Sequence, residues 1–340
     1  MINGKISNSS DKTVKDLGER AIIELMRDYF DPMPDVAVPF GDDVSAVNLS
    51  LGDVAVLKAD LLVAQTDVPP GMSLWQAARK AVVMNVSDFA AKGVQPKAVQ
   101  VSLGLPRNLK RPDLVQLAKG LNAGAREYGC YVVGGDTGEA CDLVVAVQVF
   151  GVATKNKLML RCNANAGDIL AVTGSFGRSA AGLKLLLNPE CKASATLRKN
   201  LKDAVFMPKA RLREGLALAN SSAVSASIDS SDGLAWCLHE LSTQSGVGFV
   251  ISEIPGADDV KQFAKLNSLD DVELALYGGE EYELVITVKS NMWQEAETAV
   301  ASVSGKLMPI GKATSDKQIA FESHGKKLEV EARGYEHFKN

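Results

Sequence analysis

Several features of familiar protein classes are missing from this 340-residue chain. No apolar stretch reaches the ~18 residues that a membrane span needs, and the polar start, residues 1–15, has no apolar signal region. The 37 basic and 41 acidic residues give a net charge of −4 without a basic block, which argues against a nucleic-acid partner. We therefore expect a cytoplasmic protein that binds neither membrane nor nucleic acid.

Motifs built on cysteine, histidine or glycine-rich nucleotide loops are missing too. The five cysteines form no CxxC pair and no zinc-ligand spacing, so they are expected to be reduced and mostly buried. His239-Glu240 begins like a zinc-protease motif, but Thr243 stands where the second histidine is needed. Neither G-x-x-x-x-G-K-[ST] nor G-x-G-x-x-G occurs, so any ATP site uses neither a P-loop nor a Rossmann turn.

What the chain has instead is a series of aspartates at the ends of apolar runs, beside glycine or a small residue. They lie in the segments Gly41–Asp43, Val56–Asp60, Asn85–Asp88, Gly134–Asp136 and Ile228–Gly233. Buried carboxylates are rare unless paired or bound to metal, and converging ones repel by ~4 kcal/mol per pair at about 4 Å and an effective dielectric near 20. A hard divalent cation removes this repulsion, so magnesium is predicted before zinc.

The length favours two domains rather than one. With 46% hydrophobic and 23% charged residues, the composition is that of a globular protein, and β and α segments alternate in both halves. The predicted fold class is therefore α/β with two domains. We expect a loosely ordered segment at residues 1–16, an N-terminal α/β domain at 17–154 and a C-terminal α/β domain at 155–340.

The helix predicted from Ser73 to Lys92 carries the most informative polar residues. Ser73 suits the N-cap and Gly93 the C′ position. The apolar stripe of this helix continues onto Asn85 and Asp88, where the pattern expects core residues. An aspartate at the surface near a helix C-terminus opposes the macrodipole, so a functional role is the favoured interpretation.

Other acidic turns allow two interpretations each. Residues 134–138 either bring backbone amides to an anion, with Asp136 holding a bridging magnesium, or form a hairpin turn. Residues 229–233 end a strand and open a helix; capping by Ser231 or Asp232 would leave Asp229 unexplained. Residues 278–282 form an acidic turn that is either functional or a charged hairpin loop. Arg161 is one candidate phosphate clamp among many basic residues.

Read in order, these segments resemble the thiamine-monophosphate kinase family. That family belongs to an ATP-binding superfamily that includes aminoimidazole ribonucleotide synthetase. The resemblance extends from Phe40 to Phe338 and rests on seven motifs: PFGDD at 39–43, NVSDFAAKGVQP at 85–96, VVGGDTG at 132–138, TGSFGRSAAGL at 173–183, SIDSSDGL at 227–234, YGGEEYEL at 277–284 and GYEHF at 334–338. The last two favour this family over its relatives.

The resemblance implies an aminoimidazole ribonucleotide synthetase-like fold whose N-terminal sheet pairs with that of a second copy in a dimer barrel. It implies ATP and several Mg²⁺ ions between the two domains, and a magnesium-dependent kinase that converts thiamine monophosphate to thiamine diphosphate. The residues implied as metal ligands are Asp43, Asp60, Asp88, Asp136, Asp229 and Asp232. Those implied for ATP are Gly135, Asp136, Arg161 and Ser231, and those implied for the thiamine substrate are Asp67, Glu280 and Tyr335.

The chain departs from the family at two places. Lys58-Ala59-Asp60 replaces a common Ser-Thr-Asp, so two hydroxyl ligands are absent, and Lys58 contributes either its backbone carbonyl or its ammonium in place of a cation. Asp67 replaces a histidine near the substrate of many members. Three rival functions remain: another ATP-dependent synthetase of the superfamily, a non-catalytic metal-binding protein, and an interaction scaffold derived from such an enzyme.

Overall fold

The computed structural model describes residues 13–323 and 326–338. The chain divides into two compact units, residues 1–34 with 335–340 and residues 35–334. The α-helices are α1 (Val14–Leu17), α2 (Glu19–Arg27), α3 (Ala64–Asp67), α4 (Leu74–Lys92), α5 (Arg111–Glu127), α6 (Arg178–Leu187), α7 (Ala195–Phe206), α8 (Leu212–Ser221), α9 (Leu234–Ser245), α10 (Asp258–Asn267), α11 (Asp271–Tyr277) and α12 (Trp293–Ser302). Short 3₁₀ turns are η1 (Ser50–Gly52), η2 (Lys155–Lys157) and η3 (Ser290–Met292).

The strands form two sheets, both within residues 35–334. They are β1 (Val36–Val38), β2 (Ser45–Asn48), β3 (Asp53–Val63), β4 (Pro96–Leu105), β5 (Tyr131–Glu139), β6 (Val144–Thr154), β7 (Ile169–Val172), β8 (Val224–Asp229), β9 (Gly248–Ile251), β10 (Leu284–Val288), β11 (Met308–Thr314), β12 (Ile319–Ser323) and β13 (Lys326–Glu329). A helix-bearing sheet in each half of the chain confirms the predicted α/β class.

The first sheet has the order β1-β2-β3-β6-β4-β5 and is antiparallel except for the parallel pair β4/β5. In β3, Val54, Val56 and Leu62 are buried while Leu57 and Leu61 are exposed. Because side chains alternate along a strand, the even-numbered residues of β3 share the covered face, on which α4 packs. Lys58 and Asp60 therefore belong to the face that α4 covers.

The second sheet has the order β13-β12-β9-β11-β7-β10-β8 and is antiparallel except for the parallel pair β9/β12. All five residues of β10 are buried, as expected of an interior strand covered on both faces. Next to it, β8 ends at Asp229, and α9 begins at Leu234. The predicted strand-to-helix turn thus lies at the end of the edge strand β8, beside the interior strand β10.

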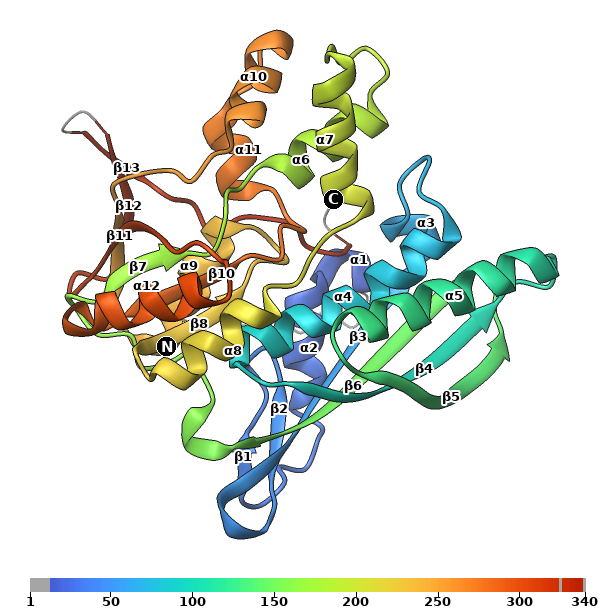
Figure 1. Ribbon diagram of the computed structural model, residues 1–340, viewed down its shortest axis with the longest axis horizontal. Coiled ribbons are helices and arrows are strands. Elements are labelled where there is room, and N and C mark those ends of the chain that lie inside the picture. The colour runs from blue at the N-terminus through green and yellow to red at the C-terminus, as the bar shows by residue number, and fades with distance from the viewer. Residues whose placement is uncertain (1–12, 324–325, 339–340) are drawn as a thin grey trace. The chain divides into compact units, whose positions relative to one another are not determined.

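Helix α4 is the element on which the two sheets converge. Its N-cap Ser73 accepts a hydrogen bond from Gln76 N at 3.2 Å, and Gly93 follows the last turn in the left-handed conformation with φ 67°. The predicted helix and both of its caps are therefore confirmed. The helix packs against α5 and the first sheet and also against α8 and β8 (Figure 1), so its polar residues reach both halves of the unit.

Strand β5 corrects the prediction of a turn at residues 134–138. The strand continues without a break to Glu139 and pairs in parallel with β4, so the hairpin-turn interpretation was wrong. Gly135 makes this pairing possible, since a Cβ atom there would lie 1.8 Å from Val101 O. The glycine is thus required by the sheet itself.

The N-terminal prediction is tested only in part. Residues 1–12 lie outside the described residues, whereas Val14–Leu17 of the expected loose segment forms α1, preceded by a Thr13 capping box.

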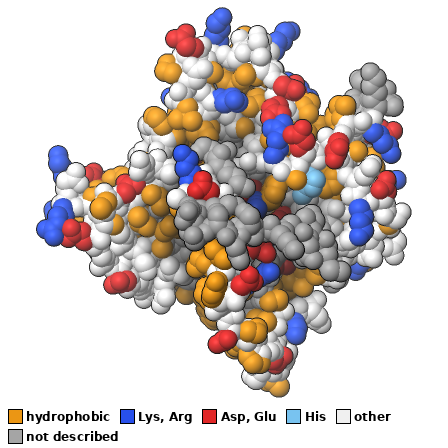
Figure 2. All heavy atoms as spheres, turned by 180° about the vertical axis from the view of Figure 1, so that it is seen from behind, with side chains coloured by type: hydrophobic (Ala, Val, Ile, Leu, Met, Phe, Trp, Pro, Cys, Tyr) orange, Lys and Arg blue, Asp and Glu red, His pale blue; other side chains and the backbone are white. Residues whose placement is uncertain are grey.

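None of the helices in the described ranges combines the length and apolar character of a membrane span. On the face seen in Figure 2, basic and acidic side chains are interspersed rather than separated by sign.

Candidate functional site

Three aspartates from distant parts of the sequence meet in one place, and we call Asp43, Asp88 and Asp229 the acidic cluster. Each offers one carboxylate oxygen, and these oxygens lie within 4.8 Å of one another. Asp43 precedes β2, Asp88 lies on the inner face of α4, and Asp229 ends β8. The residues are 3%, 5% and 4% exposed, so the three carboxylates are buried together.

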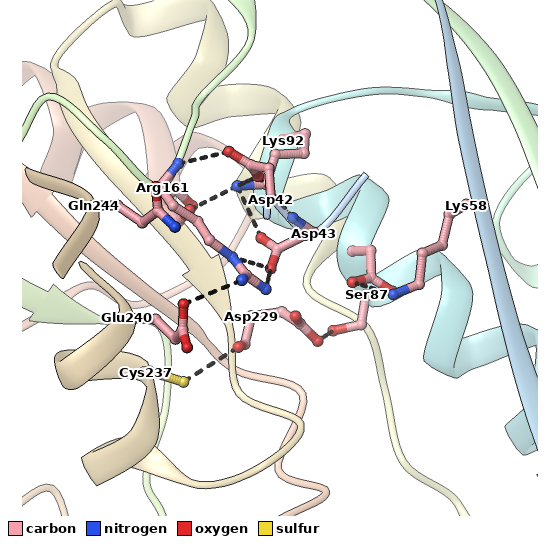
Figure 3. Close-up of polar contacts among 12 residues, drawn as sticks. Asp42, Asp43, Lys58, Ser87, Lys92, Arg161, Asp229, Cys237, Glu240 and Gln244 are labelled. Atoms are coloured by element: carbon pink, nitrogen blue, oxygen red, sulfur yellow. Dashed lines mark hydrogen bonds and ion pairs between the residues drawn. The ribbon is translucent and has the colours of Figure 1, made fainter. Parts of the chain in front are cut away.

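Two cations, Arg161 and Lys92, contact Asp43 (Figure 3). Arg161 donates from Nε to Asp43 Oδ1 at 2.7 Å and makes a second contact through Nη2. The ammonium of Lys92, which is fully buried, lies 2.8 Å from Asp43 Oδ2 and 2.7 Å from Asp42 Oδ1. It also donates to Ser227 O at 2.7 Å, so Lys92 joins α4 to β8.

The other two aspartates have different partners. Lys58 donates from Nζ to Asp88 Oδ1 at 3.0 Å and also lies 3.1 Å from Asp60 Oδ1. Asp229 accepts a hydrogen bond from the Ser87 hydroxyl at 2.7 Å, a neutral donor one residue before Asp88. Arg161, besides contacting Asp43, forms an ion pair with Glu240, in which Nη1 lies 3.6 Å from Glu240 Oε2.

The charges around each carboxyl group separate their pKa values. Burial alone would raise the pKa of Asp43, but Arg161 and Lys92 outweigh burial and lower it. Burial raises the pKa of Asp88 well above its usual range, and Asp229 and Asp60 add to the rise against the pull of Lys58. Burial and the charge of Asp43 raise the pKa of Asp229 to about 7. Asp43 is therefore the most readily ionised of the three, whereas burial opposes the ionisation of Asp88 and Asp229.

These properties fit a hard divalent cation. Three buried carboxylate oxygens close enough to share one ion are the donor set that Mg²⁺ prefers, and a bound cation would offset the burial and mutual repulsion that oppose ionisation of Asp88 and Asp229. The amide oxygen Asn85 Oδ1, one turn before Asp88, is buried and has no hydrogen-bond partner among the described residues. The residues present thus suit the metal that the sequence predicts.

The structure brings two more predicted residues near the cluster. Asp60 is joined to it through Lys58, as described above. Asp232 lies in the turn after Asp229, and the charges of both aspartates add to burial in raising the pKa of the Cys237 thiol. The N-cap of α9 is Gly233, with no side-chain cap hydrogen bond, so simple helix capping does not account for this turn.

Two residues predicted to bind ATP and metal, Gly135 and Asp136, lie on the edge strand β5 of the first sheet and not in the acidic cluster. Gly135 and Asp136 belong to β5, where they pair with Val101 and Ser102 of β4. Every residue of β5 is exposed, and Asp136 does not join the acidic cluster. The assignments of Gly135 and Asp136 to ATP and metal remain predictions.

Ser231, a predicted ATP contact, and Glu280, a predicted substrate contact, are hydrogen-bonded through their backbones. Glu280 N donates to Ser231 O at 2.7 Å, and Tyr282 N donates to Ser230 O at 2.9 Å. Glu280 and Tyr282 both adopt positive φ values, of 61° and 54°. The loop is thus pinned along the turn that follows β8, and it connects α11 to β10 rather than forming the hairpin considered from the sequence.

Asp67 and Glu280 share a partner that the sequence did not single out. The ammonium of Lys80, 1% exposed, forms an ion pair with Glu280 and donates to Asp67 O at 3.2 Å. The carboxylate of Asp67 turns back to accept Val63 N at 2.7 Å. Tyr335 belongs to the other compact unit, in which its hydroxyl lies 3.3 Å from His337 Nδ1.

Sequence reasoning missed Lys92, Lys80, Ser87 and Asp42. A signal existed for Lys92, because residues 81, 85, 88 and 92 follow one helical stripe that the prediction traced only as far as Phe89. Lys80 and Ser87 lie off this stripe, and all but one residue of α4 from Ala77 to Lys92 are buried, so their roles depend on the elements that surround the helix.

Comparison with known proteins shows the family of this chain. The model for AIR synthase related protein matches residues 41–153 with its N-terminal domain and 165–324 with its C-terminal domain. A thiamine-monophosphate kinase of Nitrosopumilus maritimus is 36% identical over 88% of this chain and 93% of the relative. This chain belongs to the thiamine-monophosphate kinase family.

A second curated relative and a solved structure are similar to nearly the whole chain. The thiamine-monophosphate kinase of Pyrococcus horikoshii is 36% identical, with 93% of this chain and 96% of the relative covered. A solved structure of AaThiL complexed with AMPPCP and TMP is 26% identical, with a TM-score of 0.83 over 97% of this chain and 100% of that one. The aminoimidazole ribonucleotide synthetase-like fold that the sequence predicted is thereby confirmed.

Proposed function

We propose that this protein is a magnesium-dependent kinase that transfers the γ-phosphoryl group of ATP directly to thiamine monophosphate, giving thiamine diphosphate and ADP. The observation that carries the proposal is the acidic cluster, which gathers Asp43, Asp88 and Asp229 from three segments into one buried site. The family and the AMPPCP and TMP bound by its structural relative support the same substrates.

Asp43, Asp88 and Asp229 would hold the metal, with Asp60, Asp136 and Asp232 as further candidate ligands. These side chains would hold a magnesium ion whose charge would offset that of the phosphates. Arg161 would add a fixed positive charge for the nucleotide, and its contacts to Asp43 and Glu240 orient its guanidinium beside the cluster. Gly135 and Ser231 are the remaining candidate ATP contacts.

The proximity of the two substrates is supported by the loop at 278–282. The hydrogen bond between Glu280 N and Ser231 O joins a candidate substrate contact to a candidate ATP contact. Lys80 brings Asp67 to the same Glu280. From the family resemblance, Tyr335 is the remaining candidate contact for thiamine monophosphate.

The acceptor is itself a phosphate with a second pKa of about 6, so at neutral pH it is already ionised. The protein then needs no general base and no covalent nucleophile. Its residues have to position two polyanions in line and reduce their mutual repulsion, which is the main catalytic demand of phosphoryl transfer. We therefore propose that no residue of this chain is phosphorylated during turnover.

We also propose a homodimer formed through the first sheet. The uncovered face of this sheet exposes Leu57, Leu61 and Phe150, which are 44%, 50% and 38% exposed, and Leu57 pairs directly with Phe150. An apolar face of this kind on a folded sheet marks an interface. Sedimentation of the protein should give a dimer that Leu57→Asp converts to monomers; a monomeric wild-type protein would contradict the proposal.

The proposed function is tested by incubating the protein with ATP, Mg²⁺ and thiamine monophosphate and identifying the product by mass. Thiamine diphosphate and ADP in equal amounts are expected, and ADP without thiamine diphosphate, or formed with another acceptor such as a synthetase substrate, would refute the proposal. Asp88→Asn should abolish the product. Asp258→Asn, at a side chain that is 101% exposed, is the matched control and should not change it.

A further inference from the structure

The side chain of Lys58 occupies an unusual place for a lysine. It extends from β3 on the face covered by α4, and only 21% of the side chain is exposed. Its Nζ lies 3.1 Å from Asp60 Oδ1 and 3.0 Å from Asp88 Oδ1, so one ammonium joins a carboxylate of the strand to a carboxylate of the helix. Asp88 is at the same time a member of the acidic cluster.

In the described part of the chain, the other cations near the acidic cluster contact other groups than Asp60 and Asp88. Lys92 and Arg161 contact Asp43, and Asp229 is hydrogen-bonded to the neutral Ser87. Among the described residues, Lys58 is the one cation in contact with Asp60 and Asp88. Without it, two carboxylates would face each other across a partly buried space, which is the arrangement that binds divalent ions through oxygen ligands.

We propose that the Lys58 ammonium acts as a built-in cation that occupies one ion position of the site, so that this chain binds one divalent ion fewer than a variant with a hydroxyl there. The inference rests on the proposed function for the identity of the remaining ions, but its geometry stands on Lys58, Asp60 and Asp88 alone. The sequence left two roles open for Lys58, a metal ligand through its backbone carbonyl or a substitute cation through its ammonium. The proposal favours the ammonium.

The experiment counts metal ions rather than turnover. Mn²⁺ is titrated into the nucleotide-free protein while free Mn²⁺ is followed by electron paramagnetic resonance, for wild type, Lys58→Ser and Lys58→Arg. Lys58→Ser should bind about one more Mn²⁺ per chain than wild type, because a small hydroxyl opens the space and adds an oxygen ligand. Lys58→Arg keeps the positive charge and should give the wild-type count.

A second readout covers the case in which Lys58→Ser folds only with metal. Melting temperatures are measured in EDTA and in Mn²⁺, and the Mn²⁺-dependent rise should be larger for Lys58→Ser than for wild type or Lys58→Arg. Equal counts and equal rises in all three proteins would overturn the inference even if thiamine diphosphate is formed. An extra ion in Lys58→Ser would support it even if the kinase assay fails, so the two proposals are tested separately.

Discussion

Replacing Lys92 with methionine tests how much the core of the site depends on a buried charge. The fully buried ammonium has three acceptors, Asp42 Oδ1 and Ser227 O at 2.7 Å and Asp43 Oδ2 at 2.8 Å. Methionine keeps most of the stem and removes the charge, which leaves two carboxylates short of a partner and Ser227 O without its side-chain donor. Breaking a buried ion pair from one side costs ~3–5 kcal/mol.

Arg161 remains bound to Asp43 in this variant, so we expect a loss of ~4 kcal/mol in the free energy of unfolding rather than a larger value. That is a large part of the ~5–15 kcal/mol that stabilises most proteins. Urea unfolding followed by circular dichroism measures it, with Lys119→Met, at an exposed position of α5, as the matched control. Adding Asp42→Asn to Lys92→Met should recover ~1 kcal/mol or more. A loss below ~1 kcal/mol in Lys92→Met would refute the reasoning.

Four further outcomes are expected. The pKa of Asp229, raised to about 7, means that the native state binds more protons than the unfolded chain between its usual pKa of about 4 and 7, so metal-free protein should lose up to ~4 kcal/mol of stability as pH rises through this window. Urea melts in EDTA at pH 5 and pH 8 should show a smaller loss in Asp229→Asn than in wild type, because the raised pKa of Asp88 still contributes in both, and Mg²⁺ should reverse the loss. Equal pH dependence in both proteins would exclude Asp229 as a source. Lys80→Met frees Glu280 and should raise KM for thiamine monophosphate about tenfold, or ~1.4 kcal/mol, with KM for ATP unchanged; a parallel rise in both constants would contradict the assignment to the thiamine side. Gly135→Ala should destabilise by ~3 kcal/mol because its Cβ would lie 1.8 Å from Val101 O, whereas Gly134→Ala, with nothing within 4 Å, should cost far less; similar costs would show that β5 does not pack this closely. Transfer of a chiral γ-phosphoryl group should invert configuration at phosphorus, and net retention would reveal a phosphoenzyme.

Much of the fold was predictable where local chemistry fixes it. The caps Ser73 and Gly93 and the apolar stripe between them define α4 from the sequence alone. At β5 the hairpin-turn interpretation of residues 134–138 failed, because Gly134-Gly135-Asp136 is typical of a turn and the close approach of Val101 is not visible in the sequence.

The site was predictable in its aspartates and less so in its cations. An aspartate on an apolar stripe or at a strand end is conspicuous, and Asp43, Asp88 and Asp229 were all identified in this way. A lysine conveys no such signal, since lysines are usually exposed. Lys92 and Lys80 are buried only because β8, the 278–282 loop and the segment before α4 close around them, and these contacts join residues far apart in the chain.

The central claim is that Asp43, Asp88 and Asp229 jointly hold a divalent ion beside the phosphates of ATP. It is tested most directly by anomalous diffraction from a crystal of the protein grown with Mn²⁺ and a non-hydrolysable ATP analogue. We predict a Mn²⁺ peak bonded to oxygens of all three carboxylates and of the analogue's phosphates, at ~2.2 Å. Analogue bound with its phosphates and metal away from these three side chains would contradict it.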